Sequence, residues 1–199
     1  MTEVFLASGN KHKCIEFQSF LREVRIKTPA DIGMSFTPIE NGNSFFENAM
    51  IKAQALYEVL QQPVLADDSG LCVTALHDAP GIYSSRYAGE HANGPEQDKK
   101  NIEKLLHELA ETKSDDRSAY FVACIVLYLE KNRFFVSQEI CKGEIVSLAQ
   151  GTNGFGYDPI FFIPNLGKTM AELSLEEKNK CSHRAKALLH MQKIIAGVF

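Results

Sequence analysis

The chain has 199 residues, of which 45% are hydrophobic and 23% charged, as in an ordinary globular domain. Its formal net charge of −4 argues against nucleic acid as a partner, because general affinity for DNA or RNA requires a basic surface. No window approaches the ~18 apolar residues that a membrane span requires, so no membrane partner is expected. The start MTEVFLASGN is not typical of a secretory signal. Five scattered cysteines without a CxxC pair indicate reduced thiols in a cytoplasmic protein.

Strand-like and helix-like segments alternate along the first half of the chain. Residues 4–7 are expected to form a buried strand, followed by a helix whose apolar face extends to Val24. A second helix is expected over residues 44–60, because Ser44 and Glu47 have capping-box spacing. The next strand, PVLA, is expected to end at two adjacent aspartates.

The second half continues the alternation around one hairpin. A helix is expected over residues 101–111, and two long strands joined at Lys131–Asn132 form the predicted hairpin. Residues 158–163 are expected to form a short strand, and a capped helical region begins at Ser174. The pattern predicts an α/β fold with a mixed sheet, in a single domain over residues 1–199.

Two polar clusters lie at the starts of the first two helices. Residues 8–13, SGNKHK, form a small-residue turn into a helix N-terminus, whose free backbone N–H groups suit a phosphate. Glu40 precedes a turn at residues 41–42, and Asn48 and Lys52 share one helix face. Taken alone, the first cluster is better explained as a helix cap and the second as a solvated surface.

A third cluster, LADDSGL, places Asp67 and Asp68 side by side. Paired carboxylates suit a divalent cation such as Mg²⁺, which prefers oxygen ligands and often bridges to substrate phosphates. Because neighbouring strand residues point to opposite sides, we expect the two acids to have different roles. For Asp67, capping a turn through Ser69 and Gly70 is an equal alternative.

The fourth cluster comprises GTNGFGYDPIFF and GKTMAELSLEEKNKCSHRAKAL. Glycines around Phe155 allow close backbone approach to a ligand and expose an aromatic face for stacking. Lys178, His183 and Arg184 converge on one site only if the helix breaks near residues 181–182, where Ser182 is a suitable new N-cap. The tetrapeptide LGKT is not the end of a P-loop, because Phe162 occupies the position of the first glycine.

Together, the segments ASGNKHK, ENGNSFFENAMIKA, ADDSGLCVTALHDAPGIYSSRYAG, GTNGFGYDPIFF and GKTMAELSLEEKNKCSHRAKAL resemble the inosine triphosphate pyrophosphatase family, in its order and from residue 7 to 188. The resemblance implies Mg²⁺-dependent cleavage between the α- and β-phosphates of ITP, dITP or XTP, giving the nucleoside monophosphate and pyrophosphate. It also implies a cytoplasmic homodimer and an elongated two-lobed α/β fold, with a central mixed β-sheet flanked by helices and an active-site cleft between the lobes. His77 and Asp78 depart from the family, which commonly has small glycines there.

The same resemblance implies a role for each matching residue. Asp68 corresponds to the general base and metal-associated acid, and Glu40 to a second metal ligand. The implied phosphate-binding loop consists of Ser8, Gly9, Asn10, Lys11, His12 and Lys13. The other implied substrate-binding residues are Lys52, Ser69, Phe155, Gly156, Tyr157, Asp158, Lys178, His183 and Arg184.

The chemistry of hydrolysis explains this selection of residues. In the expected reaction, Lys13 and Lys52 together with Mg²⁺ would screen the triphosphate charge, and Asp68 would then orient or deprotonate the attacking water. Hydrogen-bond donors on Arg184 and His183 match the acceptor oxygen at C6 of hypoxanthine or xanthine and disfavour adenine. Two alternatives stay open: a house-cleaning pyrophosphatase for modified pyrimidine nucleotides, and a nucleotide sensor without catalysis.

Overall fold

The computed structural model describes residues 2–89 and 94–199. Within these ranges, one seven-stranded sheet has the order β2-β1-β3-β4-β5-β6-β7. Its strands are β1 (Thr2–Leu6), β2 (Val24–Lys27), β3 (Val64–Val73), β4 (Ser118–Glu130), β5 (Arg133–Ile145), β6 (Phe161–Ile163) and β7 (Lys168–Thr169). β1 pairs in parallel with β2 and β3, whereas β6 pairs antiparallel with β5 and β7. The predicted α/β fold with a mixed sheet is therefore confirmed.

The capping residues expected at Ser44 and Ser174 lie at helix starts, as predicted. The α-helices are α1 (Lys11–Phe20), α2 (Phe45–Leu60), α3 (Pro95–Glu111), α4 (Leu175–Cys181) and α5 (His183–Val198). Side chains of Asn10, Ser44 and Ser174 accept backbone N–H groups at the starts of α1, α2 and α4. The predicted break between α4 and α5 is confirmed, because Ser182 has extended φ/ψ angles of −68° and 155°.

Several predicted element boundaries are wrong. The third helix begins at Pro95, six residues before its predicted start at residue 101. The first helix ends at Phe20, and Val24 begins strand β2 instead of extending the helix face. Pairing with β1 decides this, and such a long-range contact is not visible in local periodicity. Residues 158–160 form a 3₁₀ turn and the strand begins only at Phe161, because Pro159 has no N–H to donate to a ladder. The predicted hairpin is confirmed, with Asn132 in the left-handed region at φ 66°.

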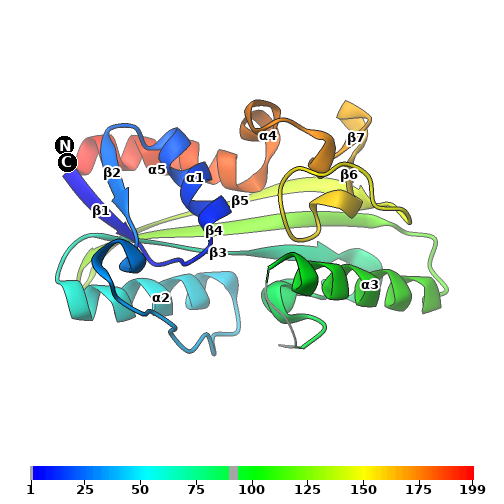
Figure 1. Ribbon diagram of the computed structural model, residues 1–199, viewed down its shortest axis with the longest axis horizontal. Helices are drawn as coiled ribbons and strands as arrows, with labels where there is room; N and C mark the ends of the chain where they lie inside the picture. Colours follow the sequence, from blue (N-terminus) through cyan, green and yellow to red (C-terminus); the bar gives the residue numbers. More distant parts are fainter. Residues whose placement is uncertain (1, 90–93) are drawn as a thin grey trace. The chain divides into compact units, whose positions relative to one another are not determined.

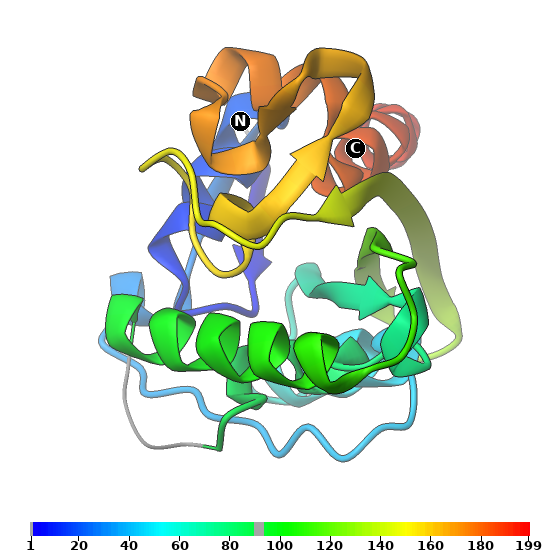
Figure 2. The same cartoon turned by 90° about the vertical axis from the view of Figure 1, so that its right-hand side faces the viewer.

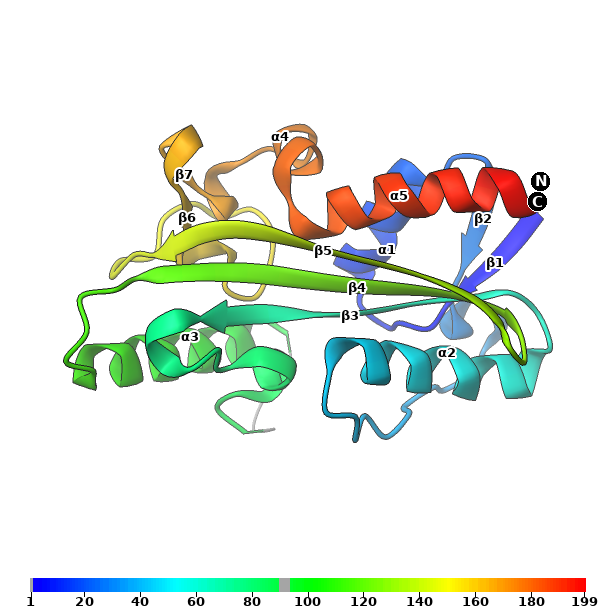
Figure 3. The same ribbon diagram turned by 180° about the vertical axis from the view of Figure 1, so that it is seen from behind.

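The described chain divides into two compact units, each assembled from separate segments. Unit 1 consists of Met1–Asp68, Ala123–Glu139 and His183–Phe199, and unit 2 of Ser69–Val122 and Ile140–Ser182. Strands β3, β4 and β5, which Figure 3 draws along their length, each contribute residues to both units by their residue ranges. The single domain over residues 1–199 and the cleft between two lobes stay predictions.

Unit 1 has a helix layer on each face of its strands (Figure 1). Val4, Leu6 and Leu65 face α1 and α5 in one core cluster that also contains Phe17, Leu188 and Met191. Phe5, Ala7, Val64 and Ala66 face α2 in the other cluster, which contains Ala49, Ala53 and Leu56. The alternation follows from the period of two in a strand. Within unit 1, strand β3 thus presents odd-numbered residues to α1 and α5, and even-numbered residues to α2.

Unit 2 has its own core around α3. Leu105 and Leu109 of α3 pack with Leu71, Val73 and Phe161 in one cluster. Figure 2 looks onto this unit, with α3 running across the lower part of the view and β6, β7 and α4 above it. In the loop after β3, His77 and Asp78 have φ angles of 53° and 64°. These left-handed angles explain why the resembling family commonly has glycine at such positions.

Candidate active site

Asp67 and Asp68 lie in the middle of a strand, so the prediction that the strand ends there is wrong. β3 continues to Val73, and Ser69 and Gly70 belong to the strand instead of a turn. This also removes the alternative in which Asp67 caps a turn. Both carboxylates are buried, with exposed fractions of 1% for Asp67 and 7% for Asp68. A strand can carry two buried acids through the interior only if each has partners, and both do.

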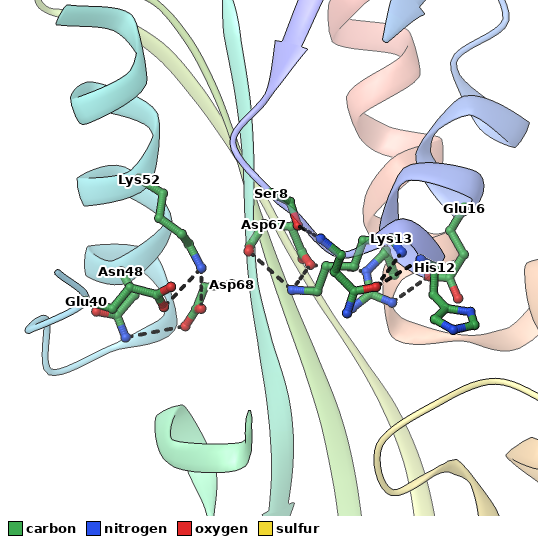
Figure 4. A network of polar contacts seen from close by, with 11 residues as sticks. Ser8, His12, Lys13, Glu16, Glu40, Asn48, Lys52, Asp67 and Asp68 are labelled. Atoms are coloured by element: carbon green, nitrogen blue, oxygen red, sulfur yellow. Dashed lines mark hydrogen bonds and ion pairs between the residues drawn. The ribbon is translucent and has the colours of Figure 1, made fainter. Parts of the chain in front are cut away.

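The two acids point to opposite sides of β3, as predicted (Figure 4). Asp67 lies on the odd-numbered side and forms ion pairs with Lys13 of α1 and Arg184 of α5, at 2.7 and 3.2 Å. Arg184 also donates from Nη1 to Glu16 of α1 at 2.5 Å. These two basic and two acidic side chains form a buried cluster with no formal net charge, which we call the Asp67 cluster.

The charges of the Asp67 cluster stabilise one another. Burial alone disfavours the carboxylate, but Arg184 and Lys13 hold the pKa of Asp67 well below its usual range. Burial lowers the pKa of Lys13, and the attraction of Asp67 does not fully offset that effect. Burial also opposes the charge of Arg184, yet Asp67 and Glu16 raise its pKa further. Asp67 therefore stays ionised at neutral pH and anchors Lys13 and Arg184.

Asp68 lies on the even-numbered side, against α2. Its Oδ1 accepts from Lys52 Nζ at 2.7 Å, and its Oδ2 accepts from Asn48 Nδ2 at 3.5 Å, the outer limit of a hydrogen bond. Lys52 Nζ also donates to Glu40 Oε2 at 3.1 Å. Two acids share one lysine, so this Asp68 cluster (Glu40, Lys52 and Asp68) has a formal net charge of −1.

The electrostatics of the Asp68 cluster differ from those of its neighbour. Burial raises the pKa of Asp68, and the Glu40 carboxylate adds to this, so Lys52 and Lys13 offset only part of the rise. Burial opposes the charge of Lys52, but Asp68 and Glu40 outweigh it and raise the lysine pKa. Asp68 is thus the more basic of the two aspartates, which suits a proton acceptor.

The donor set of the Asp68 cluster fits a hard divalent cation. Oxygens of Glu40 and Asp68 converge on one positive centre, the Lys52 ammonium, which shows that the two carboxylates reach a common point. Mg²⁺ is commonly held by one or two carboxylates together with substrate phosphates and water. Among the described residues, no group of three or more His, Cys, Asp and Glu side chains that could hold a metal occurs. The Glu40–Asp68 pair therefore suits Mg²⁺ with the remaining ligands supplied by substrate and water.

The loop at residues 8–13 is a capped helix start. Asn10 Oδ1 accepts from the backbone N–H groups of His12 and Lys13, at 2.9 and 3.3 Å. The N–H of Asn10 donates to Ser8 Oγ at 3.1 Å. The prediction that this turn presents free N–H groups is wrong for these three, because the side chain of the N-cap residue Asn10 accepts from two of them and the Ser8 hydroxyl accepts from the third. A phosphate here would meet the Lys13 side chain or displace the Asn10 cap.

In unit 2, a glycine-rich loop is fastened around Asp158. Asp158 Oδ2 accepts from the Phe155 N–H at 3.0 Å and from Lys178 Nζ at 2.7 Å. The ammonium of Lys178 lies 5.1 Å from the centre of the Phe155 ring. Gly154 has φ 77°, and a Cβ added there would lie 2.0 Å from Asp158 Oδ2. The tight turn and the ion pair together hold Phe155, Asp158 and Lys178 as one group.

The second aromatic residue of this loop belongs to the core. Tyr157 is 4% exposed and donates its hydroxyl to the Ser84 carbonyl at 2.9 Å. The Gly156 N–H donates to Asp98 Oδ2, in the first turn of α3, at 2.8 Å. Of the two aromatic side chains, half-buried Phe155 is the one placed to offer a ring face.

The last predicted residues fall into different units. Lys178 belongs to unit 2 with Asp158, whereas His183 and Arg184 begin α5 in unit 1. Their convergence on one ligand stays a prediction. Ser69 follows Asp68 directly on β3 and is half-buried.

Two polar residues of these clusters escaped the sequence reasoning. Glu16 is a 6% exposed acid on α1, and Asp98 accepts from the Gly156 N–H. Asn48, which the sequence places with Lys52 on one helix face, is fully buried on α2. Glu16 lies three residues after Lys13 on an otherwise apolar helix face, and that position was the available signal. Nothing in the local sequence around Asp98 indicates its partner, which is 58 residues away.

Comparison with known proteins identifies the chain. The fold is an α/β fold with a mixed sheet, and the central strand β3 carries two clusters of paired acidic and basic side chains. These clusters are candidate sites for a cation and for phosphate groups. The model of the Ham1 family matches residues 4–194, and the chain belongs to that family. Within the described part of the chain, no helix is long and apolar enough to cross a membrane.

Individual relatives match over nearly their full length. A dITP/XTP pyrophosphatase of Treponema denticola is 50% identical, with 98% of this chain and 99% of the relative covered. A protein of the same name from Halalkalibacterium halodurans is 46% identical, with 97% and 98% covered. The structure of a HAM1 protein from Coxiella burnetii matches with a TM-score of 0.90 at 40% identity, covering 100% of both chains. The resemblance stated from the sequence motifs is thereby confirmed.

Proposed function

We propose that this protein hydrolyses dITP, XTP and ITP to the nucleoside monophosphate and pyrophosphate with Mg²⁺ as cofactor, and so removes non-standard purine nucleotides. The observation that carries the proposal is the Asp68 cluster, in which a basic carboxylate, a second acid and a lysine share one buried site. Relatives named dITP/XTP pyrophosphatase, 50% and 46% identical to this chain, support the choice of substrate.

Glu40 and Asp68 are the residues that would hold Mg²⁺. When bound, Mg²⁺ neutralises phosphate charge and completes its ligands from substrate and water. With a formal charge of −1, the Asp68 cluster attracts a divalent cation, whereas the neutral Asp67 cluster does not. The Lys52 ammonium then also attracts the triphosphate, and this attraction reduces the repulsion between the phosphates and the Asp68 carboxylate.

Asp68 acts as the general base in this proposal. It orients a water molecule and accepts its proton as the water oxygen bonds to phosphorus. The anhydride bond between the α- and β-phosphates breaks, and its electron pair leaves with pyrophosphate. Asp68 suits this role because it is held on a strand and both of its carboxylate oxygens face donors from α2, Lys52 and Asn48, which orients the carboxylate before the reaction.

The substrate-binding residues divide between the two units. We assign the phosphates to residues 8–13, chiefly to Lys13, whose ammonium Asp67 holds in place. Ser69 contacts substrate beside Asp68. In unit 2, the Phe155 ring stacks on the base, while residues 156–158 and Lys178 support that ring.

Base selection depends on His183 and Arg184 as hydrogen-bond donors to the C6 oxygen. Asp67 and Glu16 orient the guanidinium, so its direction is set before substrate arrives. Arg184→Lys keeps the charge and loses the planar fork, and we expect it to narrow the preference for ITP over ATP. The ratio of kcat/KM values for the two nucleotides measures this, and an unchanged ratio contradicts the assignment.

One assay tests the proposed reaction. Purified protein is incubated with Mg²⁺ and ITP, dITP, XTP, ATP, GTP, dTTP or UTP, and released pyrophosphate is measured with and without EDTA. Rapid EDTA-sensitive turnover of ITP, dITP and XTP is expected, with slow turnover of the others. Preferred turnover of dTTP or UTP would favour the pyrimidine alternative, and binding of ITP without pyrophosphate release would favour the sensor.

We further propose a homodimer in the cytoplasm. Phe46, Phe134 and Val136 are 37%, 42% and 39% exposed, and the rings of Phe46 and Phe134 lie 6.5 Å apart. A contiguous exposed apolar surface of this kind suits burial against a second copy. Light scattering after size exclusion tests the dimer, and a monomer at micromolar concentration would contradict it.

The five cysteines occur as thiols, which supports a reducing compartment.

A further inference from the structure

The side chain of Asn48 contacts Asp68 and the loop that carries Glu40, the two acids of the Asp68 cluster. It is fully buried in the second turn of α2, one helical turn before Lys52. Its Oδ1 accepts from the Gly42 N–H at 2.9 Å, and its Nδ2 faces Asp68 Oδ2 at 3.5 Å. Figure 4 shows Asn48 and Lys52 reaching the same carboxylate from successive turns of the helix.

The orientation of the Asn48 amide follows from its partners. A backbone N–H only donates, so the atom facing Gly42 is the carbonyl oxygen of the side chain. The NH₂ group therefore faces Asp68, where it can only donate. Lys52 donates to Oδ1 at 2.7 Å and the Asn48 NH₂ lies 3.5 Å from Oδ2, so each oxygen of the Asp68 carboxylate faces a donor from α2.

The contact with Gly42 also places the segment that carries Glu40. A Cβ on Gly42 would lie 2.6 Å from Glu47 Cβ and 2.8 Å from Asn48 Oδ1. Only glycine permits this close approach to the helix. Glu40 lies two residues earlier and reaches Lys52 Nζ at 3.1 Å. Asn48 thus connects the loop of one acid to the carboxylate of the other.

We propose that Asn48 is a positioning residue that sets the separation and orientation of the Glu40 and Asp68 carboxylates for a divalent cation. The inference rests on the proposed function, since that function gives the carboxylate pair its purpose. Loosening this link leaves the substrate contacts in place but misplaces the groups that act on the reacting phosphate.

Two variants separate positioning from simple structural support. Asn48→Leu has a similar volume and lacks both hydrogen bonds. Asn48→Asp keeps an acceptor for the Gly42 N–H, but it cannot donate to Asp68 and repels it instead. Ser137→Ala is the matched control, because Ser137 is a buried polar residue of unit 1 whose hydroxyl donates to the Ala187 carbonyl at 3.0 Å.

The measurements are kcat and KM for ITP, together with Mn²⁺ binding to the nucleotide-free protein by electron paramagnetic resonance. For Asn48→Leu we expect kcat to fall and the Mn²⁺ dissociation constant to rise by about 10-fold each, as is usual when a residue supporting metal ligands is lost. KM should change much less than kcat. Asn48→Asp should also lose kcat while remaining folded, and Ser137→Ala should retain wild-type kcat and Mn²⁺ binding.

Wild-type kcat in Asn48→Asp would overturn the proposal, as would an Asn48→Leu variant that differs from wild type only in thermal stability. Absence of Mn²⁺ binding by the wild-type protein would overturn the claim that the pair holds a cation. If the wild-type protein released no pyrophosphate, the proposed function would fail. The Mn²⁺ comparison between wild type and the variants would then still decide the role of Asn48.

Discussion

Replacing Arg184 with methionine removes the central cation of the Asp67 cluster. Arg184 is 2% exposed and donates to Asp67 at 3.2 Å and to Glu16 at 2.5 Å. Methionine retains much of the side-chain volume, so the main effect is electrostatic. Glu16 and Asp67 each lose their ion pair with Arg184, so the cluster passes from no net formal charge to −1 in a buried site.

The expected cost is about 3–5 kcal/mol in the free energy of unfolding, the range found when one partner of a buried ion pair is deleted. Exposed pairs contribute far less, about 0–1 kcal/mol. For a chain of this size, each kcal/mol lowers the melting temperature by about 2–4 °C. A fall of roughly 6–20 °C is therefore expected.

Urea unfolding followed by far-UV circular dichroism measures the change, since the chain has no tryptophan for fluorescence. Arg133→Met is the control, because Arg133 and its partner Glu130 are 58% and 56% exposed. The double variant Arg184→Met/Glu16→Gln restores neutrality and should recover more than half of the loss. A cost for Arg184→Met of less than about 1 kcal/mol, as for an exposed pair, would refute the reasoning. Strict additivity in the double variant would also refute it.

Three further predictions follow from the site. Asp68→Asn should lower kcat for ITP by ~10²-fold or more, the loss expected when a general base is removed. The melting temperature should stay near that of wild type, because Lys52 still pairs with Glu40. Asp31→Asn, at an exposed aspartate, is the control, and near-normal turnover by Asp68→Asn would exclude Asp68 as the base. Gly154→Ala should displace the Asp158 carboxylate and raise KM for ITP. Gly167→Ala is the control, because Gly167 has a similar φ of 63° but open space at Cβ, so this variant introduces backbone strain alone. Equal KM values in the two variants would argue against the Asp158 contact. Asp67 has a lowered folded-state pKa, so its stabilisation is fully present above the ordinary aspartate value of ~3.9 and is lost as pH falls through the folded-state pKa. Urea midpoints from pH 5 downward should consequently fall more steeply for wild type than for Asp67→Asn, and parallel curves would contradict the shift.

Local chemistry in the sequence was sufficient for much of this protein. Capping residues Asn10, Ser44 and Ser174 start helices where their side chains indicate, and Ser182 separates α4 from α5. The alternation of strand side chains predicted that Asp67 and Asp68 would face apart, and their separate partners confirm it. These features depend on neighbours within a few residues, so a linear reading contains the necessary information.

Long-range neutralisation was decided only by the tertiary structure. Two adjacent acids suggested the end of a strand, because burying two carboxylates is unfavourable unless they have basic partners, and the sequence does not show which distant residues those partners are. Arg184 is 117 residues from Asp67, and Lys52 is 16 residues from Asp68. Packing α1 and α5 on one face of β3 and α2 on the other brings these cations to the carboxylates. Strand β3 can therefore continue past its two buried acids. Asp67 belongs to a cluster with no formal net charge, whereas the Asp68 cluster has a formal net charge of −1 and can attract a cation.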